Sequence, residues 1–127
     1  MIDHVSVPVR DLDASMRFYD GVLGALGMTR HDTRPATAGY GKKYSEFWIN
    51  LRPQSTAAVN DGHHVCLRAR STAMVDAFHV AALAAGGSDD SAPALRPQHG
   101  EGYYAAFIRD PDGNRIEAVT FVAAPPS

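Results

Sequence analysis

Hydrophobic and polar residues alternate from Ile2 to Val9, with His4 on the polar side. This is the period of a half-buried strand. From Leu12 to Leu26 the apolar residues recur every three or four positions, which predicts a helix, and Asp11 or Asp13 is its expected N-cap. The apolar stripe of that helix comprises Leu12, Met16, Tyr19, Leu23 and Leu26.

Short strands should follow, of which Ser45 to Leu51 is the clearest, and Tyr40-Gly41 is expected to break the run between them. The polar, proline-containing stretch from Arg52 to Gly62 is typical of a connection. The alternation then returns from His63 to Ala69, and Ser71 can cap a second helix. The expected stripe of that helix comprises Met74, Val75, Phe78, Ala82 and Leu83.

The last third of the chain predicts an irregular segment and a hairpin. Ser88 to Gly102 contains two prolines and two glycines and is expected to be irregular. Tyr103 to Arg109 and Arg115 to Phe121 should pair as antiparallel strands. In the loop between them, Pro111 presets a turn torsion and Gly113 can take a positive φ.

The two halves repeat each other at a shift of 60 residues. His4 falls on His64, Phe18 on Phe78, and Gly27 on Gly87. Each half then has a strand, a helix and three strands. This predicts an α+β fold in which two βαβββ modules form a curved mixed sheet around a hollow. We expect one domain over residues 1–123, with module 1 at about 1–52, module 2 at about 62–121, and a tail at 124–127.

Composition narrows the possible partners. The chain has 127 residues, a formal net charge of −2 and no basic stripe, so nucleic acid is not an expected partner. No stretch approaches the roughly 20 apolar residues that span a bilayer, so no membrane partner is expected. A single cysteine, Cys66, and an N-terminus unlike a signal peptide favour a cytoplasmic location.

Three side chains should converge on the hollow if the strand parities hold. His4 opens the first strand, His64 takes the equivalent place in the second half, and Glu117 lies in the last strand. Two imidazoles and a carboxylate suit a divalent transition metal such as Fe, Mn, Ni or Zn. Three protein ligands leave positions for water or a chelating substrate, as in a catalytic site.

The chain resembles the vicinal-oxygen-chelate superfamily, which includes glyoxalases, bleomycin-resistance proteins and dioxygenases. The resemblance rests on Asp3-His4-Val5-Ser6-Val7, on Gly62-His63-His64-Val65-Cys66-Leu67 and on the Asp-Pro-Asp-Gly-Asn-Arg-Ile-Glu run ending at Glu117. It implies paired βαβββ modules, a homodimer, and metal ligands at His4, His64 and Glu117. His63 is a rival for His64, but only His64 matches the family spacing.

One departure concerns glyoxalase I, which carries a further carboxylate ligand on the last strand of the first module. By the repeat, that place is expected near Asn50, which is a poor ligand for a transition metal. Glu46 lies four residues upstream and is expected to reach the hollow only if the strand register slips. Lactoylglutathione lyase activity is therefore not the expected activity.

A second group of residues is expected around the metal. Tyr103 and His99 are the candidate catalytic residues, as a hydroxyl donor and a proton shuttle in a glycine-rich loop, and Tyr104 is the alternative hydroxyl donor. Arg68 and Arg115 share the parity of the metal ligands and are candidates for holding an anionic group of the substrate. Cys66 shares that parity, but no partner base makes it a nucleophile.

These residues predict a metal-dependent enzyme acting as a lyase, isomerase or transferase on a small, oxygen-chelating substrate. One alternative is an extradiol-type Fe(II) dioxygenase. A second is a non-catalytic drug-binding protein of the bleomycin-resistance kind, which generally lacks the full ligand set. A third is a dimerising domain with incidental histidines. Metal content separates the two metal-dependent enzymes from the drug-binding protein and the dimerising domain.

Overall fold

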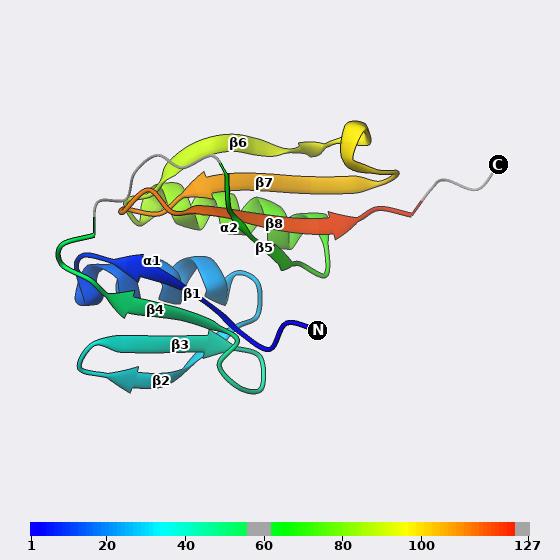
Figure 1. Ribbon diagram of the computed structural model, residues 1–127. Helices are drawn as coiled ribbons and strands as arrows, with labels where there is room; N and C mark the ends of the chain where they lie inside the picture. Colours follow the sequence, from blue (N-terminus) through cyan, green and yellow to red (C-terminus); the bar gives the residue numbers. More distant parts are fainter. Residues whose placement is uncertain (56–61, 124–127) are drawn as a thin grey trace.

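The computed structural model describes residues 1–55 and 62–123, and in them the strand–helix–three-strand unit occurs twice (Figure 1). The first module contains β1 (Val5–Val9), α1 (Leu12–Gly24), β2 (Thr29–Arg34), β3 (Thr37–Gly41) and β4 (Phe47–Leu51). The second contains β5 (Val65–Arg68), α2 (Thr72–Ala84), β6 (Ser88–Leu95), the 3-10 helix η1 (Pro97–His99), β7 (Tyr103–Arg109) and β8 (Arg115–Phe121). Part of the expected connection and the expected tail lie outside the described residues.

Each module forms its own four-stranded mixed sheet. Sheet A has the order β1-β4-β3-β2, and sheet B has the order β5-β8-β7-β6. β1 runs parallel to β4, and β5 runs parallel to β8, while the other pairs are antiparallel. The predicted α+β fold of two βαβββ modules is confirmed. The equivalent strands β1 and β5 are edge strands of their sheets.

Local sequence signals set the helix ends. The Asp11 carboxylate accepts a hydrogen bond from the Ala14 N–H at 3.0 Å, and the Ser71 hydroxyl accepts one from the Met74 N–H at 3.2 Å. Both caps satisfy amide donors that lack partners in the first turn of a helix. Neither helix is long and apolar enough to cross a membrane, within residues 1–55 and 62–123.

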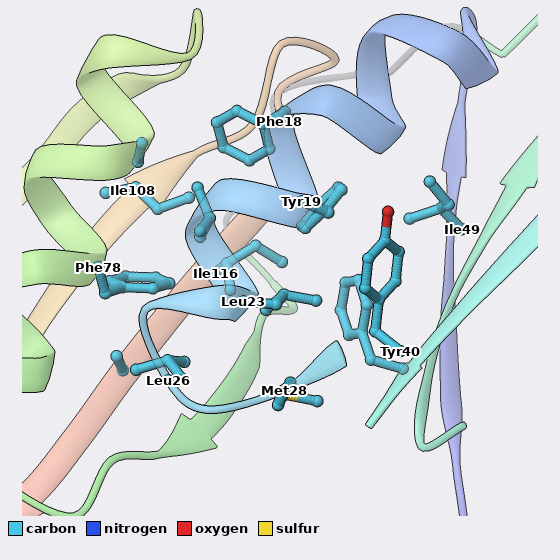
Figure 2. Packing of buried hydrophobic residues seen from close by; sticks show 14 of the residues in the cluster. Phe18, Tyr19, Leu23, Leu26, Met28, Tyr40, Ile49, Phe78, Ile108 and Ile116 are labelled. Carbon is cyan, nitrogen blue, oxygen red and sulfur yellow. The ribbon is translucent and has the colours of Figure 1, made fainter. Parts of the chain in front are cut away.

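Helix α1 forms the centre of the core and joins the modules. Figure 2 shows Phe18 and Leu26 on the side of Phe78 and Ile108, whereas Tyr19 lies toward Tyr40. All six of these aromatic and aliphatic side chains are at most 1% exposed. Because buried residues of both modules form one cluster, apolar burial holds sheet A and sheet B together.

The DPDGN loop adds a polar link between the modules. Asp110 accepts hydrogen bonds from the Tyr19 hydroxyl at 2.6 Å and from the backbone and side-chain amides of Asn114 at 2.8 Å. Asp112 accepts from the backbone N–H and the Nε of Arg10, both at 3.0 Å. Gly113 has a φ of 91°, as its place in the turn predicts.

Three element predictions are wrong. Ser88–Leu95 forms strand β6 instead of an irregular segment, because an edge strand tolerates Pro93 through register shifts between Asp89 and Ala94. Tyr40 and Gly41 lie inside β3 instead of breaking the run. Leu83 is 46% exposed, because α2 buries Val75, Phe78 and Ala82 at helical steps and turns the next residue outward.

Candidate metal and substrate site

A cavity of about 310 Å³ lies where the first residues of β1 and β5 meet. Its lining includes His4, Glu46, His64 and Cys66. Within each module the edge strand runs parallel to a central strand, β1 to β4 and β5 to β8, and both edge strands begin at the cavity. Two predicted metal ligands, one from each module, therefore line the same cavity.

His64 and Glu117 are in direct contact. The Nε2 atom of His64 lies 2.9 Å from Oε1 of Glu117. The Glu117 side chain is 2% exposed, whereas that of His64 is 37% exposed. Glu117 is brought there by β8, where it pairs with Cys66 of β5. A nearly buried carboxylate thus contacts a partly exposed imidazole.

Tyr103 completes the surroundings of that carboxylate. Its hydroxyl donates a hydrogen bond to Oε2 of Glu117, the oxygen that His64 does not contact. Desolvation and this bond raise the pKa of Tyr103, which keeps the phenol protonated at neutral pH. The second predicted catalytic residue, His99, lies on η1 with its ring centroid 5.3 Å from that of Tyr103. It contacts the tyrosine rather than the His64–Glu117 pair.

His4 shares the cavity but stands apart from this pair. Its Nδ1 lies 2.7 Å from Oδ1 of Asp3, and both side chains are more than half exposed. A carboxylate on one ring nitrogen is the usual way in which proteins orient a metal-binding imidazole. With Nδ1 bonded to Asp3, the Nε2 of His4 is the atom left for a ligand role.

The donor atoms fit a divalent metal in part. Metal–ligand bonds of about 2.1 Å at angles of 90–110° place two donors about 3.0–3.4 Å apart. The 2.9 Å between His64 and Glu117 is close to that separation. As they stand, no three His, Cys, Asp or Glu side chains are grouped closely enough to hold an ion, across residues 1–55 and 62–123. His4 has to move inward to complete the predicted set.

Cys66 lies beside the Glu117 carboxylate. Desolvation, and then the charge of Glu117 and a hydrogen bond to it, raise the pKa of this thiol to about 12. The thiol is consequently protonated at neutral pH. This agrees with the prediction that Cys66 is not a nucleophile.

The pairing register of the strands corrects the position in module 1 at which the further carboxylate ligand of glyoxalase I was expected. Glu117 pairs with Cys66 in sheet B, and the equivalent pair in sheet A is Ser6 with Trp48. Trp48, and not Asn50, therefore occupies the place equivalent to Glu117. Asn50 instead accepts a hydrogen bond from Thr37, and no slip of register is needed for Glu46 to line the cavity.

The inner face of sheet B, the face away from α2, carries the remaining candidates. Phe107, 7% exposed, forms its floor with Ala105 and Val119. Arg115 lies over the Phe107 ring and Arg68 lies over Phe121. Both predicted anion-binding arginines thus lie on the same face as Glu117, as their parity predicts.

Two further residues of this face were not predicted. Arg96 lies over Phe107, and Asp90 contacts Arg115 at 2.7 Å. Both come from the segment expected to be irregular. Without a strand there, alternation could not assign either residue to a face.

Comparison with known proteins agrees with this fold. The model of the Glyoxalase/Bleomycin resistance protein/Dioxygenase superfamily matches residues 1–118. The chain is 29% identical over 123 residues to "Virulence protein STM3117" of Salmonella typhimurium, covering 95% of this chain and 84% of that protein. A glyoxalase/bleomycin resistance protein from Albidiferax ferrireducens T118 is 34% identical in its crystal structure, with a TM-score of 0.80, covering 92% of this chain and 95% of that one.

A more distant solved structure shares the fold alone. Lactoylglutathione lyase from Agrobacterium tumefaciens is 22% identical, with a TM-score of 0.65, covering 94% of this chain and 92% of that one. The paired βαβββ modules, with a His–Glu pair between the start of edge strand β5 and the central strand β8, define a protein of the vicinal-oxygen-chelate class. The chain belongs to the Glyoxalase/Bleomycin resistance protein/Dioxygenase superfamily, as the sequence resemblance predicts.

Proposed function

We propose that this protein is a metal-dependent enzyme of its superfamily, acting as a lyase, isomerase or transferase on a small molecule with two neighbouring oxygens. His4, His64 and Glu117 hold the metal in this proposal. The observation that carries it is the environment of Glu117. Its carboxylate is 2% exposed, yet its described partners, His64, Tyr103 and Cys66, include no permanent cation. Burying a charge without a counter-charge is costly, so a bound cation is the expected partner.

A divalent ion at this place would polarise neighbouring substrate oxygens and stabilise negative charge that develops on them. Other residues of the chain orient the metal ligands and transfer protons in this proposal. Asp3 holds one nitrogen of the His4 imidazole and leaves the other for the metal. Tyr103 fixes Glu117 through Oε2 and leaves Oε1 for the metal. His99, next to Tyr103, is the residue placed to carry a proton between the site and solvent.

Two further expectations belong to the same proposal, one from the family resemblance and one from the single cysteine. We infer a homodimer, and we infer a cytoplasmic location that keeps Cys66 reduced. The molar mass in solution and subcellular fractionation test these two inferences separately.

Metal content tests the central proposal. Metal-depleted protein is dialysed against Fe(II), Mn(II), Ni(II) or Zn(II), and bound metal is measured by mass spectrometry. We expect one ion per chain, and a loss of affinity of at least about 100-fold in His64→Ala and in Glu117→Gln, because second-shell changes alone cost 10- to 100-fold. His4→Ala should weaken binding to a similar degree.

The neighbouring histidine supplies the matched control. His63→Ala removes another solvent-exposed imidazole one residue away, and it should bind metal like the wild type. Protein that takes up none of the four metals, or a His63→Ala variant as impaired as His64→Ala, would contradict the proposal. Tight binding of a bulky cationic drug by metal-free protein would instead support the drug-binding alternative.

A further inference from the structure

Two guanidinium groups meet over one aromatic ring on the inner face of sheet B. The Cζ atom of Arg115 lies 4.4 Å from the centroid of the Phe107 ring, and that of Arg96 lies 5.2 Å from it. Arg115 comes from β8, and Arg96 follows β6. Cation–π contacts of this kind cover the ring and help to keep Phe107 at 7% exposure. Two arginines from separate segments of the second module, Arg115 in β8 and Arg96 after β6, therefore form one basic patch.

Each guanidinium uses only some of its N–H groups in hydrogen bonds to the protein, so that other N–H donors stay available. Arg96 donates from Nη2 to the Ala92 carbonyl at 2.8 Å, and from Nε and Nη2 to the Ala105 carbonyl at 3.3 and 3.1 Å. Arg115 donates from Nε to Asp90 at 2.7 Å. A guanidinium has five N–H donors. Nη1 of Arg96 and both terminal nitrogens of Arg115 have no hydrogen-bond partner among the described residues.

Positive charge exceeds negative charge on this face. Arg96 contacts only backbone carbonyls and a ring, and Arg68 contacts the Phe121 ring at 4.6 Å, so neither has a carboxylate partner within residues 1–55 and 62–123. Asp90 is shared between Arg109 and Arg115. Glu117 is occupied by His64 and Tyr103. The excess charge is fixed in position and faces the solvent side of the sheet.

Phe107 connects this patch to the proposed metal site. Its ring centroid lies 5.8 Å from that of His64, and it pairs with Glu117 across the strands. Arg115 precedes Glu117 by two residues on the same face of β8, a separation of about 7 Å along a strand. One small molecule is long enough to contact both places at once.

We propose that Arg96 and Arg115 form an anion-binding subsite, which takes a carboxylate or phosphate group of the substrate. The substrate is then a compact anion, whose charged group lies about 7 Å from its metal-chelating oxygens and whose apolar body rests beside Phe107. The link to chelating oxygens rests on the proposed function. The binding of the anion does not, because it needs no metal.

The anion subsite is tested first on metal-free protein. Benzoate and benzamide have nearly the same shape and differ in charge, and each is titrated while backbone amide shifts are followed by NMR. We expect benzoate to shift the amides of Arg96, Phe107 and Arg115, with at least about tenfold tighter binding than benzamide. The double variant Arg96→Gln/Arg115→Gln should lose this preference, whereas Arg17→Gln, on the exposed face of α1, should keep it.

A charge-conserving substitution separates the loss of the anion site from misfolding of the double glutamine variant. Arg115→Lys keeps the charge on β8 and should retain part of the preference for benzoate. Equal binding of benzoate and benzamide by the wild type, or an undiminished preference in a folded double glutamine variant, would overturn the subsite.

A second comparison uses metal-loaded protein and separates the two proposals. Catechol offers the chelating oxygens alone, and 3,4-dihydroxybenzoate adds a carboxylate across the same ring. We expect the carboxylate to strengthen binding about tenfold in the wild type and not in the double glutamine variant. Preference for benzoate without metal uptake would sink the metal proposal alone, and equal binding of the two catechols to metal-loaded protein would sink the connection between the two sites.

Discussion

The hydroxyl of Tyr103 donates a hydrogen bond to Oε2 of Glu117, while Oε1 of the same carboxylate contacts Nε2 of His64. The two oxygens thus have separate partners, and the tyrosine fixes the direction in which Oε1 points. Groups that orient a metal ligand in this way usually contribute a tenfold to hundredfold gain in affinity. The phenol of Tyr103 is therefore a positioning group as well as a candidate catalytic residue.

Replacing Tyr103 by Phe should weaken metal binding about tenfold, since the ring stays and only the bond to Glu117 is lost. Equilibrium dialysis of the metal-depleted variant measures the change. Tyr104→Phe is the matched control, because Tyr104 donates to Asp76 and lies outside the site. The prediction is wrong if both variants bind metal like the wild type.

Replacing Tyr19 by Phe should lower the free energy of unfolding by about 1–3 kcal/mol, because it removes a buried donor from Asp110. Burial raises the pKa of Asp110, which increases the dependence of this carboxyl on its remaining partners. Urea denaturation measures the loss. Tyr44→Phe removes the hydroxyl of an exposed tyrosine and should change the free energy little, and an equal loss in both variants would argue against a specific link between the modules.

Asp90→Asn should destabilise the protein at pH 7 by about 0.5–1 kcal/mol, and much less at the lowest accessible pH. The hydrogen bond from Arg115 is the largest of the effects that hold the pKa of Asp90 below its usual range. The carboxyl is therefore protonated more readily in the unfolded chain, where the pKa of an aspartate side chain is about 3.9. Its contribution is complete above that pH and is lost as the pH falls through the folded pKa.

Urea denaturation at pH 7 and at acid pH, for the wild type and for Asp90→Asn, measures this difference. Glu101→Gln, an exposed loop carboxylate, should leave both values nearly unchanged. A loss of stability in Asp90→Asn that is independent of pH would show that the ion pair is not its cause.

Gly41→Ala should destabilise the protein by about 2 kcal/mol or more, because an added Cβ would lie 1.7 Å from the backbone oxygen of Tyr44. The backbone there cannot retreat as a flexible side chain could. Gly21→Ala is the opposite case, since nothing lies within 4 Å of its added Cβ in helix α1. It should stabilise the protein by about 0.5–1 kcal/mol. Thermal unfolding of both variants checks the opposite signs, and a stable Gly41→Ala would contradict the close approach.

The sequence by itself determined most of the elements and their repeat. Alternation in β1 and helical spacing in α1 are local signals, because each depends only on which residues of one segment must be buried. The caps at Asp11 and Ser71 and the turn at Gly113 are local for the same reason. These features carried the prediction of the βαβββ modules and of strands that bear His4, His64 and Glu117.

Only the tertiary structure decided what the side chains meet. The strand β6 was missed because its pairing with β7, through two register shifts, outweighs the effect of Pro93 on the local backbone. The assignment of Trp48 to the place of Glu117 required the pairing register, which no single strand contains. Likewise, the contact of Arg96 with Phe107 and the separation of His4 from Glu117 depend on how distant strands pack, and packing is a property of the whole chain.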